Sequence, residues 1–235
     1  MEHIDQRFWD KEWRDQRTEI YIEQRINCQI LKLIKPVLVE GSKVLEIGCV
    51  PARRLSILQR SYDLDTYGLD YSLNGLLDSI KSNNNLLCCD LFHLPFKTET
   101  FDLVYSLGVI EHFDDPSDAI QQHVRLLKKG GFILITIPNF SSHSVPSVIY
   151  TLAHRYDEVK KNHNMSIMFL ENFRKLFRNL SLQEIICDYY GPPVLYSPPN
   201  ITLRRISAKI NKWIDRVTIR SRLLSPELIY VGQKH

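Results

Sequence analysis

The sequence predicts an α/β fold in which strands and helices alternate around one sheet. Three neighbouring segments support this prediction. Residues 44–47 form a short apolar run with β-branched members, which is typical of a buried parallel strand. Residues 53–60 then carry apolar side chains at helical spacing, and a second strand ends at Asp70. A strand, a helix and a second parallel strand make a βαβ unit, the building block of a doubly wound sheet.

The remaining elements follow from the same periodicities and from their end signals. Ser72 is a candidate helix cap, and Asp115-Pro116 starts another helix. Lys128-Lys129-Gly130-Gly131 is suited to end that helix, because cations and glycine favour helix C-termini. The expected helices are residues 22–37, 53–60, 72–79, 115–127 and 169–180, and the expected strands are residues 44–47, 67–70, 86–89, 101–106, 133–137, 181–190 and 228–232.

The composition is that of an ordinary globular protein. The chain has 235 residues, 44% hydrophobic and 24% charged, and we expect a single domain over residues 1–235. No apolar stretch approaches the roughly 18 residues that a transmembrane helix needs, and residues 1–15 are too polar for a signal peptide. Five cysteines, an odd number without metal-ligand spacing, predict reduced thiols and a cytoplasmic protein.

The turn after the first strand is a candidate nucleotide site. In a βαβ unit a nucleotide lies across the carboxyl ends of the strands, and an acid about twenty residues after the turn can accept both ribose hydroxyls. Gly48 begins the turn, and Asp70 stands at the place of the acid. A carboxylate at a strand end can also simply cap the next turn, so both roles stay open for Asp70.

Further motifs follow this unit in order along the chain. They are Leu87-Cys88-Cys89-Asp90-Leu91, then Leu94-Pro95-Phe96, strand 101–106 followed by Glu111-His112, and Leu126-Leu127-Lys128-Lys129-Gly130-Gly131-Phe132 before strand 133–137. Together with the turn, they resemble the class I S-adenosylmethionine-dependent methyltransferases, of the small-molecule type with a methyltransferase-11-like domain. The resemblance implies a Rossmann-like, doubly wound seven-stranded sheet of order 3-2-1-4-5-7-6, in which strand 7 is antiparallel.

The resemblance also implies a cofactor and its contacts. The cofactor is S-adenosylmethionine, which becomes S-adenosylhomocysteine after methyl transfer. Asp70 is expected at the ribose and Asp90 near the adenine amino group, although Asp90 can equally cap the loop that begins at Leu91. The full set of expected cofactor-binding residues is Glu46, Gly48, Cys49, Asp70, Tyr71, Asp90, Leu91 and Ser106.

The glycine-rich turn of the family is altered in this chain. Glu46 and Gly48 are kept, but Val50 and Ala52 stand where the family has glycine. Glycine lets the backbone approach the cofactor closely and adopt positive φ, which costs other residues about 1–2 kcal/mol. We therefore expect a shifted turn with weakened cofactor binding. A methyltransferase-like binding protein or partner subunit that has lost catalysis is the alternative.

His112 is the candidate catalytic residue. It follows the fourth strand and faces the cleft of the expected fold, where an imidazole can take a proton from the methyl acceptor. Many methyl transfers need only proximity and alignment, so a hydrogen-bonding or orienting role is the alternative. Some relatives bind a divalent metal through carboxylates near this Glu-His pair. Gly108 stands where a further acid would be expected, so the sequence predicts no metal.

Two segments flank an expected cofactor-binding core of residues 41–140. Residues 1–40 are expected to form a helical arm that contains Phe8, Trp9 and Trp13. The arm either folds over cofactor and substrate, as in the methyltransferases it resembles, or simply caps the core. Residues 139–164 lose regularity, and residues 141–168 are expected to be an insertion on the substrate side.

Residues 191–226 are expected to be a basic amphipathic helical insertion before the last strand. Apolar side chains share one face of its helix at residues 203–217, while seven cations stand against Asp215 alone between residues 203 and 222. Such a helix can lie on an anionic membrane surface, meet an anionic substrate, or dock on the domain or on a second subunit. Nucleic acid is not expected as a partner, because the charge is confined to one segment and no aromatic-basic platform accompanies it.

Together these patterns predict a methyltransferase that acts on a small-molecule or saccharide-type acceptor. A nicotinamide-dependent oxidoreductase fits poorly, because Asp90, Glu111-His112 and the terminal strands belong to the methyltransferase arrangement. None of the motifs specifies whether the acceptor atom is oxygen, nitrogen or carbon.

Overall fold

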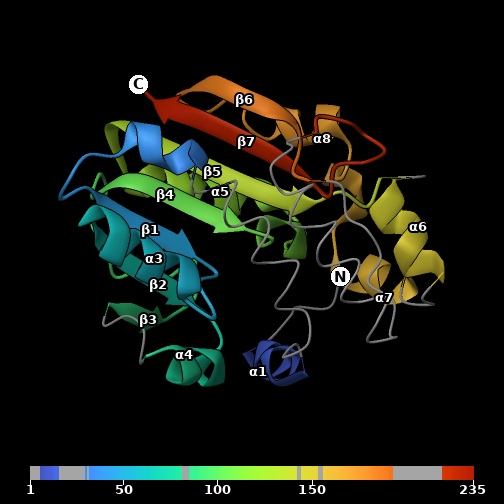
Figure 1. The fold of residues 1–235 in the computed structure, drawn as a ribbon, viewed down its shortest axis with the longest axis horizontal. Coiled ribbons are helices and arrows are strands. Elements are labelled where there is room, and N and C mark those ends of the chain that lie inside the picture. Colours follow the sequence, from blue (N-terminus) through green and yellow to red (C-terminus); the bar gives the residue numbers. More distant parts are fainter. Residues whose placement is uncertain are drawn as a thin grey trace.

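The chain folds around a seven-stranded sheet of order β3-β2-β1-β4-β5-β7-β6 (Figure 1). The computed structural model describes residues 6–15, 30, 32–80, 85–141, 144–152, 156–192 and 219–235. Strands β1 to β5 pair in parallel, whereas β7 runs antiparallel to both β5 and β6. The strands are β1 Lys43–Ile47, β2 Asp65–Asp70, β3 Leu86–Cys88, β4 Phe101–Leu107, β5 Leu127–Pro138, β6 Leu182–Tyr190 and β7 Glu227–Lys234. The predicted strand order and the antiparallel last strand are confirmed.

Helices cover both faces of the sheet. One hydrophobic cluster joins β1, β4 and β5 to Ile120 of α5 and Phe173 of α8, and a second joins the opposite face to Leu55 of α3 and Leu76 of α4. The helices are α1 Gln6–Asp15, α3 Arg53–Tyr62, α4 Leu73–Ser79, α5 Pro116–Leu126, α6 Val145–Leu152, α7 Tyr156–Asn162 and α8 Leu170–Lys175, with 3-10 turns η2 Lys35–Val37, η3 Ile110–His112 and η4 Met165–Ile167. Burial on both faces explains why β1 reads as a nearly continuous apolar run.

The parallel strands end together at one edge of the sheet, which we call the carboxyl edge. Strand β1 ends at Ile47, β2 at Asp70 and β4 at Leu107, and these three strands are neighbours. Helices α1, α6 and α7 lie beyond this edge, on the side toward which β1 and β4 point in Figure 1. The topology therefore brings the loops after β1, β2 and β4 to the place where ligands bind in open α/β sheets.

Two predicted helix starts carry the expected caps. The Ser72 hydroxyl accepts a hydrogen bond from the Gly75 backbone N–H at 3.0 Å at the start of α4. The Asp115 carboxylate accepts from the Ser117 N–H at 2.9 Å at the start of α5. Each side chain satisfies a backbone donor that the first helical turn leaves unpaired. Lys128 to Gly131, in contrast, lie inside β5, which begins directly after α5.

The segment expected to lose regularity, residues 139–164, contains the two helices α6 and α7. Ser144 accepts a hydrogen bond from the Ser147 N–H at 3.2 Å and so acts as the cap of α6. Pro146 stands in the first turn of that helix, where a missing N–H costs no hydrogen bond. The proline that looked like a breaker is thus part of a helix start. Helix α8 is shorter than expected and ends at Lys175.

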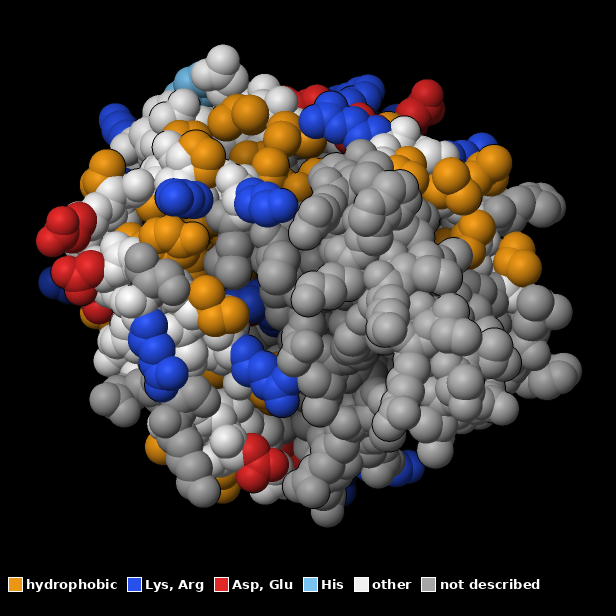
Figure 2. Space-filling model, in the orientation of Figure 1, with side chains coloured by type: hydrophobic (Ala, Val, Ile, Leu, Met, Phe, Trp, Pro, Cys, Tyr) orange, Lys and Arg blue, Asp and Glu red, His pale blue; other side chains and the backbone are white. Residues whose placement is uncertain are grey.

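Several predictions from the sequence lie outside the described residues. The basic helix at residues 203–217 is one, and most of the helix at residues 22–37 is another. Among the described residues, no helix is both long enough and apolar enough to cross a membrane. Figure 2 shows Lys and Arg side chains interspersed with hydrophobic ones on the described part of one face. The domain boundaries and the cytoplasmic location stay predictions.

The altered turn between β1 and α3 has positive φ at only one of its two altered positions, Val50 and Ala52. Gly48 has φ +72°, and Ala52 has φ 55° and ψ 19°, the left-handed conformation. Val50 is not among the described residues with positive φ, and its peptide bond to Pro51 is cis. Its side chain is buried in the cluster with Leu55. The strain expected at both altered positions therefore falls on Ala52 alone.

We predict that Ala52→Gly stabilises the fold and Val50→Gly does not. The left-handed conformation of Ala52 costs about 1–2 kcal/mol, and glycine removes this cost. Because glycine also raises the entropy of the unfolded chain, the free energy of unfolding should rise by only about 0.5–1 kcal/mol. Removing the buried Val50 side chain should cost about 2 kcal/mol or more. Urea unfolding followed by circular dichroism measures both variants. Equal destabilisation by both would contradict this assignment of the strain.

Candidate active site

The Asp70 carboxylate joins the ends of β1 and β2. One oxygen accepts a hydrogen bond from the Val50 backbone N–H at 3.0 Å, and the other accepts from the Ser72 N–H at 2.9 Å. The side chain is 6% exposed, and burial raises its pKa although these backbone bonds act in the opposite direction. Asp70 thus caps the following turn, one of the two roles open from the sequence. The Tyr71 N–H also interacts with this carboxylate, and a carboxylate has about four acceptor positions, so at least one is left for a ligand hydroxyl.

Glu46 has a role that differs from the expected cofactor contact. Its side chain is fully buried, ion-paired with the Arg54 guanidinium of α3, and it accepts a hydrogen bond from the Tyr105 hydroxyl at 2.9 Å. Burial and the Glu46 charge raise the pKa of Tyr105 well above its usual value, so the phenol stays a donor. The side chains of β1 alternate between the two faces of the sheet, and the Glu46 side chain points to the face that α3 covers. Its carboxylate therefore links α3 to β4 beneath the turn.

Cys49 and Ser106 are also turned away from the carboxyl edge. The Cys49 thiol is buried, its pKa is raised well above the usual value mainly by burial, and its sulfur lies where a side chain at Gly68 would have to go. The Ser106 hydroxyl lies 3.0 Å from Nε2 of buried His123, whose Nδ1 lies 2.8 Å from the Ala119 carbonyl. Burial lowers the pKa of His123 to about 4. For both residues, only the backbone is left for a cofactor contact.

The loop after β3 carries the second expected acid. Asp90 accepts a hydrogen bond from the Phe92 N–H at 2.9 Å, and its other oxygen lies 3.3 Å from His93 Nδ1. It therefore caps the loop, as the alternative from the sequence has it, yet 39% of its side chain stays exposed. Leu91 is buried, whereas Tyr71 remains 36% exposed next to Asp70. Tyr71 and Asp90 are thus the expected side chains that a ligand can reach from solvent.

Helix α1 lies across the carboxyl edge and touches both halves of it. The Asp10 carboxylate accepts hydrogen bonds from the Ser72 hydroxyl at 2.6 Å and from the Asn74 N–H at 3.1 Å. The Trp9 ring packs edge-on against His112, with ring centroids 4.7 Å apart. One short helix thus reaches from the cap of α4, beside Asp70, to the turn after β4. Of the two roles open for the N-terminal arm, this position matches the arm that covers the site.

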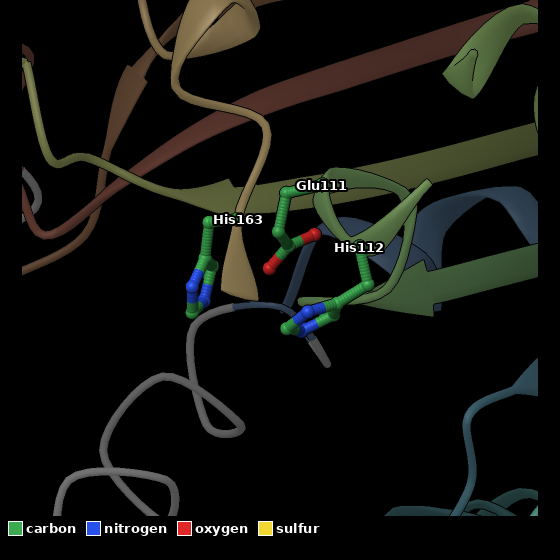
Figure 3. A group of neighbouring side chains, drawn as sticks. All are labelled: Glu111, His112 and His163. Carbon is green, nitrogen blue, oxygen red and sulfur yellow. The ribbon is translucent and has the colours of Figure 1, made fainter. Parts of the chain in front are cut away.

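Three titratable side chains converge at the turn after β4. Glu111 and His112 belong to η3, and His163 follows α7 (Figure 3). Their possible ligand atoms all lie within 4.8 Å of one another, and the two imidazole centroids are 4.6 Å apart. The Glu111 carboxylate lies between the two rings in Figure 3. We call these residues the Glu-His-His cluster.

Burial sets the charge of this cluster. Burial raises the pKa of Glu111 to about 8. The hydrogen bond from the Glu111 backbone N–H opposes this rise, and the Glu227 charge adds to it. Burial and the neighbouring His163 lower the pKa of His112 to about 3, and burial also lowers the pKa of His163. Both rings are therefore neutral near pH 7. His112 Nδ1 is held at 2.8 Å from the Asn162 carbonyl, and a base with so low a pKa is a poor proton acceptor. Both observations favour the orienting role of His112 over the general base.

The sequence analysis did not identify His163 as part of this site. Glu111 and His112 are adjacent in the chain and follow a recognisable strand, but His163 comes from the segment expected to be irregular. The contact depends on α7, whose end is fixed to η3 by the hydrogen bond from Asn164 N–H to the Glu111 carbonyl at 2.6 Å. No short-range pattern signals such a contact.

Comparison with known proteins gives the family. A family model described as a methyltransferase domain matches residues 45–135. An uncharacterized protein of Methanocaldococcus jannaschii is 30% identical over 205 residues, covering 79% of this chain and 87% of that protein. The chain is a class I S-adenosylmethionine-dependent methyltransferase. Its cofactor is accordingly S-adenosylmethionine.

Other relatives of this methyltransferase differ in the acceptor that their names give. A human protein named probable tRNA methyltransferase 9B is 34% identical over 114 residues, 46% of this chain and 23% of that protein. Phosphoethanolamine N-methyltransferase 3 of Arabidopsis thaliana is 26% identical over 157 residues, 63% of this chain and 30% of that enzyme. The chain thus spans less than a third of either protein, and the two names specify different classes of acceptor.

Solved structures match over nearly the whole methyltransferase. A chain in the complex between the Haloferax volcanii Trm112 methyltransferase activator and a methyltransferase has a TM-score of 0.67 at 18% identity, covering 96% of both chains. A possible histamine N-methyltransferase from Thermotoga maritima has a TM-score of 0.66 at 20% identity, covering 100% of both chains. At 18% and 20% identity, the similarity shows a shared fold and nothing further about function.

The carboxyl edge of the methyltransferase fits its cofactor. A side-chain carbon on Gly48 would lie 2.4 Å from Val109, so glycine is needed for the tight turn. Helix α3 begins after this turn without a side-chain cap, which leaves backbone N–H groups suited to a carboxylate. Asp70 ends β2, and Asp90 follows the end of the neighbouring strand β3 by two residues, as a nucleoside with a ribose and an adenine requires.

We predict that Asp10→Ala loosens the cover without disturbing the fold. The substitution removes the two hydrogen bonds from α1 to α4, each worth about 1 kcal/mol or more for a charged acceptor. Dissociation of S-adenosylhomocysteine, measured by stopped-flow displacement, should become about five- to thirtyfold faster at about 1.4 kcal/mol per tenfold. Lys11→Ala, an exposed change on the same helix, is the control. Equal rates for both variants would show that α1 does not retain the cofactor.

Proposed function

We propose that this methyltransferase transfers its methyl group to a small-molecule or saccharide-type acceptor bound between η3 and helix α1. The observation that carries the proposal is that Trp9 of α1 contacts His112 while Asp10 of the same helix contacts the Asp70–Ser72 turn. An acceptor positioned at the sulfonium methyl would then lie under the helix. A covered site of this kind suits a compact acceptor better than a folded macromolecule.

The lining of the acceptor side supports the same proposal. Phe140 packs edge-on against His163 at 5.8 Å, and His163 in turn adjoins His112. Together with Trp9, these rings give one aromatic wall next to the buried Glu111 carboxyl group. Aromatic surface with a few convergent polar groups is typical of sites for small ligands.

Methyl transfer at this site would be an in-line displacement. An acceptor oxygen, nitrogen or carbon attacks the methyl carbon, the bond from that carbon to the sulfonium sulfur breaks, and S-adenosylhomocysteine leaves with the electron pair. A proton that the acceptor carries at the attacking atom is lost to solvent, before the attack or when the product is released. The protein contributes alignment and exclusion of water, which are effective where the nucleophile is already strong enough. His112, neutral and held by its Nδ1 on the Asn162 carbonyl at 2.8 Å, would orient the acceptor through Nε2.

Asp70, Tyr71 and Asp90 would hold the cofactor through their side chains, and Gly48 and Cys49 would do so through their backbone. Glu46 would act through Arg54 and Tyr105, which support the turn from below. In this proposal the acids carry most of the binding, because a charged hydrogen bond contributes about 1.5–3 kcal/mol, more than the strain at Ala52.

We predict that Asp70→Asn weakens binding of S-adenosylhomocysteine at least tenfold. The amide keeps the volume of the side chain but removes the charge and one acceptor, so about 1.4 kcal/mol or more should be lost. Isothermal titration calorimetry measures the affinity, and circular dichroism checks the fold. Asp65→Asn, at the opposite end of β2, is the matched control. Affinity that stays within twofold of wild type in Asp70→Asn would sink the proposed cofactor contact.

The class of acceptor is tested by transfer of labelled methyl groups. The protein is incubated with methyl-labelled S-adenosylmethionine and, in parallel, with small amines, small alcohols, nucleotide-linked sugars and bulk tRNA. We expect label in a small-molecule or saccharide fraction. Label in tRNA alone would overturn the proposed acceptor class while leaving the methyltransferase activity in place.

A further inference from the structure

The Glu-His-His cluster brings one possible ligand atom from each of three residues within 4.8 Å of the others (Figure 3). His112 Nδ1 lies 2.8 Å from the Asn162 carbonyl, and His163 Nδ1 lies 2.9 Å from the Val159 carbonyl. A carbonyl only accepts, so each Nδ1 carries the ring proton and each Nε2 keeps its lone pair. A second ring nitrogen fixed on a backbone carbonyl is the arrangement that orients histidines toward a metal.

The third member, Glu111, is a buried carboxyl group whose hydrogen bonding is incomplete among the described residues. Glu111 is 1% exposed, and its Oε2 has no hydrogen-bond partner among the residues that the structure describes. A buried polar atom without a partner costs free energy, so such atoms are rare unless something binds them. Glu227 is close enough to act on Glu111 electrostatically, and its Oε2 is buried as well. A cation bound beside Glu111 would satisfy its Oε2 and favour the ionised carboxylate.

The cluster is held in place by its own backbone. The Asn164 N–H donates to the Glu111 carbonyl at 2.6 Å, and the Asn164 amide donates to the Phe113 and Asp114 carbonyls at 3.3 and 3.1 Å. These bonds fix the end of α7 onto η3, so His163 and His112 approach each other on a defined scaffold. Prearranged ligands of this kind are what a metal site requires.

We propose that Glu111, His112 and His163 form a binding site for a divalent first-row transition metal such as zinc or iron(II). Two imidazoles and one carboxylate suit these metals, whereas magnesium and calcium prefer oxygen ligands. Metal bonds of about 2 Å place tetrahedral ligand atoms about 3.3 Å apart, so the cluster would contract by about 1–1.5 Å. Three protein ligands leave at least one position open, typical of a site that also binds a substrate oxygen or nitrogen.

This proposal revises the prediction that no metal binds. That prediction rested on Gly108 in the place of an acid. Gly108 has φ +69°, a conformation that other residues rarely adopt, so the turn itself accounts for the glycine. The third ligand comes instead from His163. With a metal bound, His112 Nε2 would be a ligand, so the metal would hold the methyl acceptor in place of the imidazole. That use of the metal rests on the proposed function, but metal binding itself does not.

The test is direct metal binding, with zinc and cobalt(II) as probes. Full-length protein is stripped with a chelator and titrated by calorimetry, and cobalt(II) absorption reports the ligand set. We expect one equivalent with the wild type, and at least tenfold weaker binding in Glu111→Gln and His163→Ala. His235→Gln, an exposed histidine at the other end of the chain, should bind as wild type does. Calorimetry with S-adenosylhomocysteine on each variant checks that the fold is intact.

Three results would overturn the metal site. The first is the absence of stoichiometric metal binding by the wild type, and the second is equal metal affinity in all variants. The third is that an amine acceptor binds to the metal-free protein and loses affinity in Glu111→Gln, which would show that Glu111 pairs with the acceptor and not with a metal. Because metal binding is read without turnover, an inactive preparation would not affect the result. Loss of acceptor methylation with intact metal binding would instead count against the proposed function.

Discussion

The hydrogen bonds of the Asp70 carboxylate are the contact on which the site depends. One side chain at the end of β2 holds the Val50 amide of the turn after β1 and the Ser72 amide at the start of α4. Ser72 in turn caps α4 and receives α1 through Asp10. The turn, the helix and the cover are therefore connected through a single buried carboxylate. A ligand that bonds to the same oxygens would connect to all three elements at once.

Most of the fold could be predicted because its information is local. The apolar run of β1, the cap at Ser72 and the Asp115-Pro116 helix start each specify an element from a few neighbouring residues. The strand order came from the resemblance to the methyltransferases, since periodicity alone does not give pairing. Helices α6 and α7 were missed because Pro146 reads as a breaker, although it stands in the first turn of a helix.

The candidate site could be predicted in part, and the limit has a physical cause. Asp70 ends β2 and Asp90 follows the end of β3 by two residues, so their place at the edge follows from the topology. Glu46, Cys49 and Ser106 stand in the same motifs, but side-chain alternation and helix packing turn them inward toward Arg54, Gly68 and His123. His163 reaches His112 through a tertiary contact between α7 and η3. The acceptor side of the methyltransferase thus depends on contacts that no short motif encodes.

The two halves of the site differ in how they are built. The cofactor half rests on strand ends and helix starts, which are fixed by the sheet. The proposed acceptor half rests on η3, α7 and α1, the helix proposed as its cover, and its polar groups are buried beside aromatic rings. Such a division lets one sheet support different acceptors, since the loops at the carboxyl edge change without altering the strands.

Hydrogen–deuterium exchange with and without S-adenosylhomocysteine tests most directly whether the cofactor binds at this edge and under α1. Binding should slow exchange in residues 6–15, 48–56 and 70–76 together, because the Asp70 contacts and the Asp10 contacts join them. Strand β6, at the far edge of the sheet, should exchange at the same rate in both states. Protection of residues 48–56 without residues 6–15 would contradict the role of α1 as the cover, and protection of neither would contradict the site itself.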